Sequence, residues 1–248
     1  MPNALSIPIG ALVSAGKAIY ERWTTHRRDQ FYTTFLEALQ IEQATGIRDA
    51  TVDEALAYLL ADETRSEVIY DAFRRVCFTK SRNYGPRIIG LLTGELVNNA
   101  LTADDEQEMV FAAAERMGDG ELTEFCKHYQ YLLEQASDTR KLKRDVMLGG
   151  KKIIHIYNDQ SHEVGGRRTD SLLTPISPWT AYGLWAGQLQ ACGLLEVTLT
   201  QNTELIREDS ERHIDYDQTW VTQVTTFTYD PGCRTLYDLY ARARNIGG

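Results

Sequence analysis

The sequence lacks an excess of positive charge and lacks closely spaced cysteines. Its 26 Lys and Arg residues stand against 35 Asp and Glu residues, which gives a net charge of −9 at neutral pH. This balance argues against broad, non-specific attraction to nucleic acid or to anionic membranes. The cysteines Cys77, Cys126, Cys192 and Cys233 are far apart, and none belongs to a Cys-x-x-Cys pair. This spacing predicts free thiols in a reducing, cytoplasmic compartment rather than a zinc site or a disulfide framework.

The sequence also lacks a hydrophobic run long enough to cross a membrane. The apolar segment 7–13 is followed by Lys17, Glu21 and Arg22, whereas a spanning helix needs about 20 apolar residues. No positively charged segment precedes Ile7, as a secretory signal would require. We expect the start of a helix that packs on the core, with a shallow membrane or partner contact as the alternative.

Recognisable catalytic motifs are missing as well. The segment 148–152 (Leu-Gly-Gly-Lys-Lys) is no phosphate-binding loop, because it lacks the leading glycine and no Ser or Thr follows the lysine. The chain has no Gly-x-Ser-x-Gly sequence and no apparent set of nucleophile, base and orienting group. These observations favour a non-enzymatic protein without a cofactor, although sites can assemble from distant residues.

What is present indicates a folded, mainly α protein with a small β component. Hydrophobic residues make up 43 % and charged residues 25 % of the chain, as in ordinary globular proteins. Residues 1–136 predict a domain of several helices. The first helix is expected from Ile9 to Thr45, with Gly46 as its stop. Expected N-caps of later helices are Thr51 (in a capping box with Glu54), Asp62 and Thr102, and further helices are expected over 88–97 and 121–135.

Residues 137–175 differ from the flanking regions and are expected to form a basic connector. They contain eight basic and five acidic residues. Glycine pairs at 149–150 and 165–166 indicate turns, and residues 153–157 could form one strand.

Residues 176–248 predict a winged-helix-like domain of helix, two strands and helix. Ser177 is a good N-cap, and Pro178 fits the first position of a helix that is expected to reach Cys192. The strands are expected over 196–207 and 219–229, the second being rich in β-branched and aromatic residues. A short final helix would follow the turn at 229–232.

The helix expected at 178–192 does not have the chemistry of a DNA reader. It contains no Lys or Arg, although phosphate and base contacts depend on such residues. The segment 207–217, in the place of a wing, carries more acidic than basic residues. We therefore predict that this helix contacts protein, through Trp179, Tyr182 and Trp185.

Two other kinds of site are alternatives. Nucleic acid could bind through the basic connector, at Arg140, Lys141, Lys143, Arg144, Lys151, Lys152, Arg167 and Arg168. A metal ion could bind through His155, Asp159 and His162, which supply suitable nitrogen and oxygen ligands but match no known zinc spacing. That site would imply a metal-dependent hydrolase.

The layout resembles that of the Abi-alpha proteins, which are linked to abortive infection. The resemblance is carried by segment 7–10 (Ile-Pro-Ile-Gly), segment 56–61 (Leu-Ala-Tyr-Leu-Leu-Ala) and segment 193–195 (Gly-Leu-Leu). It implies an apolar N-terminal helix, a helical region, a winged-helix-like end and a role in phage–host conflict, without an assigned chemistry. The leading hypothesis is therefore a cytoplasmic, non-enzymatic interaction protein that binds a protein partner or itself. A winged-helix regulator that binds DNA through the connector is the main alternative.

Overall fold

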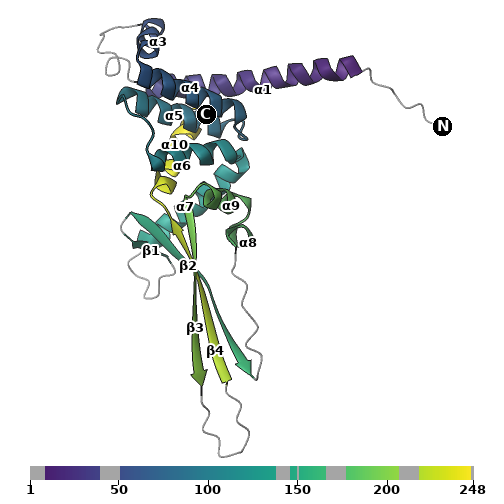
Figure 1. The fold of residues 1–248 in the computed structure, drawn as a ribbon, viewed down its shortest axis with the longest axis vertical. Helices are drawn as coiled ribbons and strands as arrows, with labels where there is room; N and C mark the ends of the chain where they lie inside the picture. The colour runs from purple at the N-terminus through teal and green to yellow at the C-terminus, as the bar shows by residue number, and fades with distance from the viewer. Residues whose placement is uncertain are drawn as a thin grey trace, which may run out of the picture. The chain divides into compact units, whose positions relative to one another are not determined.

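The computed structural model describes residues 9–39, 51–137, 146–149, 151–165, 177–206 and 218–246. Side chains are described for a smaller set, which leaves out those of residues 9–20, 52–53, 157–165, 202–206 and 218–223. The protein is mainly helical with one four-stranded antiparallel sheet, which confirms the predicted fold class at this level (Figure 1). None of the described helices is both long and apolar enough to cross a membrane.

The chain divides into two compact units, and the division differs from the expected domains 1–136, 137–175 and 176–248. Unit 1 comprises residues 1–122 and 236–248, and unit 2 comprises residues 123–235. The connector expected at 137–175 is not a separate linker, because it contributes two strands to the sheet of unit 2.

Most helices lie wholly or partly in unit 1. They are α1 (Ile9–Ala38), α3 (Val52–Ala61), α4 (Glu63–Phe78), α5 (Tyr84–Asn98), α6 (Asp105–Arg116), α7 (Asp119–Ser137), which continues into unit 2, and α10 (Gly232–Asn245), whose last part belongs to unit 1. The N-terminal half of α1 extends beyond the other helices of the unit in Figure 1. The helix ends at Ala38, and the stop expected at Gly46 lies outside the described residues.

The predicted helix starts at Thr51 and Asp62 are confirmed. The Thr51 side chain accepts a hydrogen bond from the backbone N–H of Glu54, whose carboxylate accepts one from the backbone N–H of Thr51. Asp62 accepts from the backbone N–H of Arg65. The expected cap at Thr102 is wrong. Asp104 caps α6 instead, because its carboxylate is three residues before Gln107 and the two form a capping box.

The core of unit 1 is closed by a tight seam between α1 and α5. A side chain at Gly90 would place its Cβ 2.6 Å from the backbone oxygen of Phe31, so only glycine allows this approach. The adjoining residues Phe31, Phe35 and Ile89 are buried. The seam therefore requires glycine at position 90, and large buried side chains pack on either side of this close approach.

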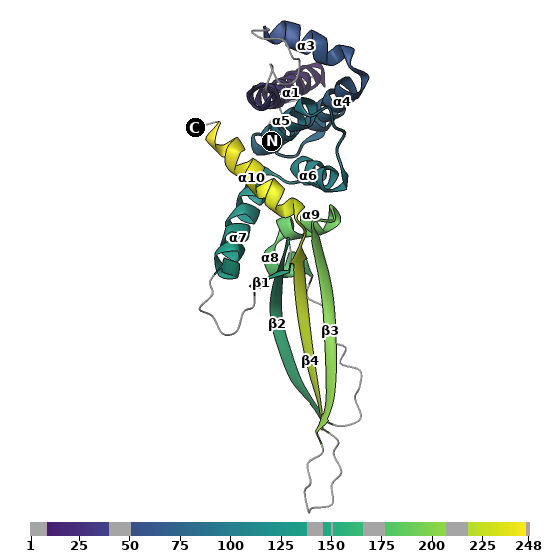
Figure 2. The same ribbon diagram turned by 90° about the vertical axis from the view of Figure 1, so that its left-hand side faces the viewer.

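Unit 2 is built around a sheet with the strand order β1-β2-β4-β3, and every neighbouring pair is antiparallel (Figure 2). The strands are β1 (Val146–Gly149), β2 (Lys152–Gly165), β3 (Leu195–Ile206) and β4 (Gln218–Tyr229). The strand expected at 153–157 is confirmed within β2, and the two strands expected near the C-terminus are confirmed as β3 and β4. The wing expected at 207–217 lies outside the described residues.

The helix expected at 178–192 is broken in two. Gly183 has a φ of 94°, which a helix cannot contain, and it separates α8 (Pro178–Tyr182) from α9 (Leu184–Ala191). The expected N-cap is confirmed, since Ser177 accepts from the backbone N–H of Thr180. The order helix, strand, strand, helix is present, but the helix is split and the sheet has four strands. A winged-helix domain is therefore not established.

Candidate functional site

A cluster of histidine and aromatic side chains lies within unit 2. We call it the His–Tyr cluster, and its members are His128 of α7, His155 of β2, Tyr182 of α8, Trp185 of α9 and Tyr229 of β4. Five elements that are separate in the sequence thus contribute one side chain each. The cluster is the largest group of titratable and aromatic residues that the structure brings together in the described part of this unit.

The position of His128 follows from the pattern of α7. Phe125, Tyr129, Leu132 and Ala136 are buried and recur at helical spacing, so that they form the face that α7 turns to the core of unit 2. His128 adjoins this face and is half-buried. His128 therefore lies at the edge of the core because the neighbouring residues of α7 are buried there.

Two hydrogen bonds pair each histidine with a tyrosine. The Nε2 atom of His128 and the hydroxyl of Tyr229 share a hydrogen bond of 3.2 Å. The hydroxyl of Tyr182 and the Nδ1 atom of His155 share another, of 2.5 Å. The two pairs are neighbours, because the ring centroids of His128 and Tyr182 are 4.6 Å apart. One nitrogen of each histidine and both tyrosine hydroxyls thus have hydrogen-bond partners within the cluster.

Burial determines the charge state of the cluster. Desolvation, with a smaller contribution from the nearby His155, lowers the pKa of His128 to about 4. Desolvation likewise raises the pKa of Tyr229 above its ordinary range, with a smaller contribution from Tyr182. At neutral pH, His128 is therefore uncharged and Tyr229 is protonated. A histidine in this state is poorly suited to donate a proton in catalysis, but it can pack and form hydrogen bonds.

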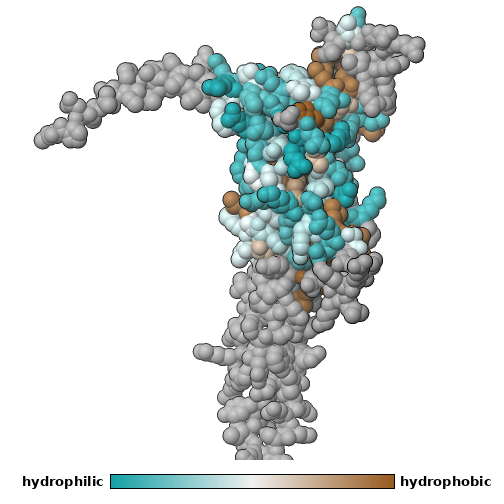
Figure 3. Space-filling view, turned by 180° about the vertical axis from the view of Figure 1, so that it is seen from behind, coloured by the Kyte–Doolittle hydropathy of each residue, from teal (hydrophilic) through white to brown (hydrophobic). Residues whose placement is uncertain are grey.

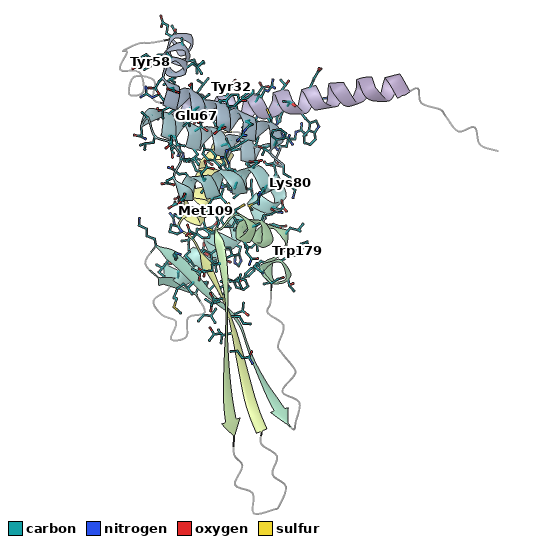
Figure 4. All side chains as sticks on the ribbon, in the orientation of Figure 1. Tyr32, Tyr58, Glu67, Lys80, Met109 and Trp179 are labelled. Carbon is teal, nitrogen blue, oxygen red and sulfur yellow. The ribbon has the colours of Figure 1, made fainter. Side chains whose placement is uncertain are left out.

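The residues predicted to bind a protein partner do not form one surface. Trp185 is only 3 % exposed and packs against Phe125 at a ring distance of 5.8 Å. Tyr182 is half-buried within the His–Tyr cluster. Trp179 is 62 % exposed and projects from α8 in Figure 4. The prediction assumed a continuous helix, in which these three positions would share a face, and the break at Gly183 separates them.

The residues predicted to bind a metal ion are also separated. His155 pairs in register with Phe227, and His162 pairs with Val221, six residues further along β4. At about 3.3 Å per residue the two histidines are roughly 20 Å apart along the strand. Zinc–nitrogen bonds measure about 2 Å, so His155 and His162 cannot share one ion. Asp159 pairs with Val224, between these positions. The described residues contain no group of acidic, histidine or cysteine side chains that could hold a metal.

Only part of the predicted nucleic-acid surface is described. Lys151 and Lys152 are exposed at the turn between β1 and β2, and the Nζ atom of Lys152 is 3.8 Å from Asp230. The remaining predicted residues lie outside the described ranges: Arg140, Lys141, Lys143, Arg144, Arg167 and Arg168. The nucleic-acid contact at the connector therefore stays a prediction.

Sequence reasoning did not identify His128 or Tyr229 as members of a site. His128 stands alone in α7, and its partners follow 27, 54, 57 and 101 residues later in the chain. The one available signal was the buried face of α7, which indicates that position 128 borders a core. Nothing local indicates which side chains meet it there.

No family model, curated protein or solved structure matches the chain. The layout resemblance to the Abi-alpha proteins consequently stays a prediction.

Proposed function

We propose that this protein is a non-enzymatic interaction protein, and that the exposed side chains of Trp179 and Leu184 contact a protein partner. The observation that carries the proposal is the exposure of these side chains, 62 % for Trp179 and 51 % for Leu184. Tryptophan is among the residues that contribute most to binding at protein interfaces. We call these two residues the α8–α9 contact face.

Contacts at both ends of α8 fix the position of Trp179. Pro178 is buried, and Ser177 caps the start of α8. Tyr182 fixes the other end of α8 through its hydrogen bond to His155. Because these contacts exist before a partner arrives, less conformational entropy is lost on binding than for a tryptophan on a mobile loop.

The composition of the two helices also supports a protein partner. Neither α8 nor α9 contains Lys, Arg, Asp or Glu. Charged residues are depleted at the centres of protein interfaces, where aromatic residues are enriched. The same helices offer no cation for a phosphate group, which makes nucleic acid an unsuitable occupant of this face.

The biological setting that we propose is bacterial antiviral defence or its control. It is motivated by the layout resemblance to the Abi-alpha proteins and rests on that resemblance alone. The efficiency of phage plating on a bacterial host that expresses the full chain, compared with the Trp179→Ala variant, tests it. Equal plating with the wild-type chain, the variant and an empty vector would contradict this setting but not the contact face.

The contact face is tested by comparing matched surface substitutions. Trp179→Ala and Leu184→Ala remove the proposed contacts, while Tyr70→Ala removes an aromatic side chain of unit 1 that is 68 % exposed. Partners captured by the full chain from its native lysate would be purified, and the affinity of each binary complex measured. We expect an affinity loss of about tenfold or more for Trp179→Ala and little change for Tyr70→Ala.

The same variants distinguish a partner protein from self-association. If the molar mass in solution corresponds to an oligomer that Trp179→Ala converts to a monomer, the occupant is a second copy of the chain. Wild-type affinity of Trp179→Ala and Leu184→Ala for every captured partner, together with an unchanged molar mass, would exclude this face as the contact.

A further inference from the structure

Unit 1 carries a second aromatic group, in which the rings are stacked with guanidinium groups. Trp23 of α1 is 44 % exposed. The guanidinium carbon of Arg27 lies 5.2 Å from the centroid of its ring, and that of Arg82 lies 5.6 Å from it. Arg82 comes from the loop between α4 and α5, so two separate segments converge on one indole. These distances are those of cation–π pairs.

A similar group lies one to two turns further along α1. The guanidinium carbon of Arg28 is 5.0 Å from the ring centroid of Phe73 in α4. The ring of Phe73 is also 6.2 Å from that of Tyr32, which is 42 % exposed. We call the residues Trp23, Arg27, Arg28, Tyr32, Phe73 and Arg82 the Arg–aromatic surface. Figure 4 labels Tyr32 on α1 and Lys80 in the α4–α5 loop, beside this surface.

Arg28 and Arg82 differ from the ion-paired basic residues of unit 1. Arg75 is paired with Glu108 at 2.6 Å, Lys80 with Glu121 at 2.7 Å, and Arg242 with Glu95. Among the described residues, Arg28 and Arg82 have no carboxylate within ion-pair distance, and their side chains lie over aromatic rings and are exposed. Their charges are therefore available to an anionic ligand.

The local charge is positive although the chain as a whole is acidic. The segment 21–29 contains Arg22, Arg27 and Arg28 against Glu21 and Asp29, and Arg82 adds a further positive charge. The nearby carboxylate of Asp119 is engaged by Ser81 and by the backbone N–H groups of 82–84. Asp119 is the first residue of α7, and its carboxylate accepts these hydrogen bonds beside the start of α5, which is a structural role.

We propose that the Arg–aromatic surface binds single-stranded nucleic acid. Guanidinium groups bind phosphate oxygens and stack on flat rings, while exposed aromatic rings stack with unpaired bases. The alternation of rings and guanidinium groups suits a ligand that alternates bases and phosphates. The net charge of −9 opposes this binding at long range, so we expect a modest affinity that depends strongly on salt. The proposal is independent of the α8–α9 contact face and goes beyond it.

The test uses the full chain and labelled oligonucleotides. The probes are an oligothymidylate and an oligouridylate of about 12 nucleotides, within the usual range of such sites, and a DNA duplex of the same length. Binding is followed by fluorescence anisotropy at several salt concentrations. The variants are Trp23→Ala, Arg28→Gln and Arg82→Gln, and the matched control is Arg244→Gln, an exposed arginine on α10. Thermal melting of each variant shows that it is folded.

We expect both single-stranded probes to bind more tightly than the duplex, whose bases are already stacked. Trp23→Ala should weaken binding by about fivefold or more, and each arginine substitution should reduce the salt dependence by about 0.7 in the logarithmic slope. Arg244→Gln should change neither quantity. A preference for one of the two single-stranded probes identifies DNA or RNA as the source of the ligand. No binding at low salt, equal binding of the duplex, or wild-type binding by Trp23→Ala and Arg82→Gln would overturn the proposal.

Discussion

The two aromatic groups of this protein are built in opposite ways. In the His–Tyr cluster of unit 2, His128 is neutral at pH 7, and Trp185 is 3 % exposed. In the Arg–aromatic surface of unit 1, the partners of the rings are charged, and Trp23 is 44 % exposed. Figure 3 shows one face of unit 1 as mostly hydrophilic, with apolar residues in small separate areas.

This difference indicates which rings serve stability and which are free for binding. A ring that is enclosed with neutral partners contributes its full apolar area to folding. A ring that is partly exposed beside guanidinium groups contributes less of its apolar area to folding, and its exposed part is accessible to a ligand.

The largest expected effect comes from the enclosed tryptophan. Trp185→Ala removes a ring that packs against Phe125, His128 and Tyr182, and it should lower the free energy of unfolding by about 3–5 kcal/mol. Trp179→Ala, on the neighbouring helix, should change it by about 0.5 kcal/mol or less. Denaturant unfolding of the full chain, followed by circular dichroism, measures both. Equal effects of the two substitutions would remove the distinction between enclosed and open rings.

The second prediction concerns pH, because His128 of the His–Tyr cluster can change its charge and the arginines of the Arg–aromatic surface cannot. The pKa of His128 is about 4 in the fold, below its ordinary value of 6.5. Above pH 6.5 both the folded and the unfolded chain leave it neutral, so it has no effect on stability. As pH falls from 6.5 towards 4, His128 becomes protonated in the unfolded chain but stays neutral in the folded chain. The free energy of unfolding should therefore decrease by roughly 2–3 kcal/mol.

Unfolding measured from pH 7.5 to 4.5 tests this, with His128→Gln as the control whose pH dependence should be flatter. The pKa of Asp119 is also lowered in the fold, below its ordinary value of 3.8. The stability that Asp119 contributes is therefore lost as pH falls from that ordinary value through the lowered pKa, which is below this window. Arginine stays charged throughout, so binding at the Arg–aromatic surface should not follow the same curve. An identical pH dependence of His128→Gln and wild type would show that His128 is not buried in a neutral form.

Local signals in the sequence predicted most of the secondary structure. The caps at Thr51, Asp62 and Ser177 were predicted because a cap and its partner lie within three residues of each other. The strands of unit 2 were predicted from β-branched and aromatic runs. By contrast, the break at Gly183 was missed, since glycine is compatible with a helix interior and only the backbone conformation shows otherwise.

The candidate site could hardly be predicted. The pairing of β2 with β4 places His155 opposite Phe227, which follows 72 residues later, and Tyr182 of α8 reaches His155 from a third element. Such pairing depends on the whole sheet and leaves no local pattern. The same holds for Arg82 beside Trp23, because the sequence shows the two residues but not the loop that brings them together.

The smallest expected effect tests whether the seam of unit 1 depends on the absence of side chains. Gly90→Ala would place a Cβ 2.6 Å from the backbone oxygen of Phe31, which cannot rotate away, so α1 and α5 would have to separate. We expect a loss of about 1–3 kcal/mol in the free energy of unfolding. Gly120→Ala is the matched control, because nothing lies within 4 Å of its Cβ in α7. Alanine is the better helix former, so this variant should be unchanged or more stable by up to about 1 kcal/mol. If Gly90→Ala were also neutral, the seam would have room for a larger residue, and the close approach of α1 and α5 would not depend on glycine at position 90.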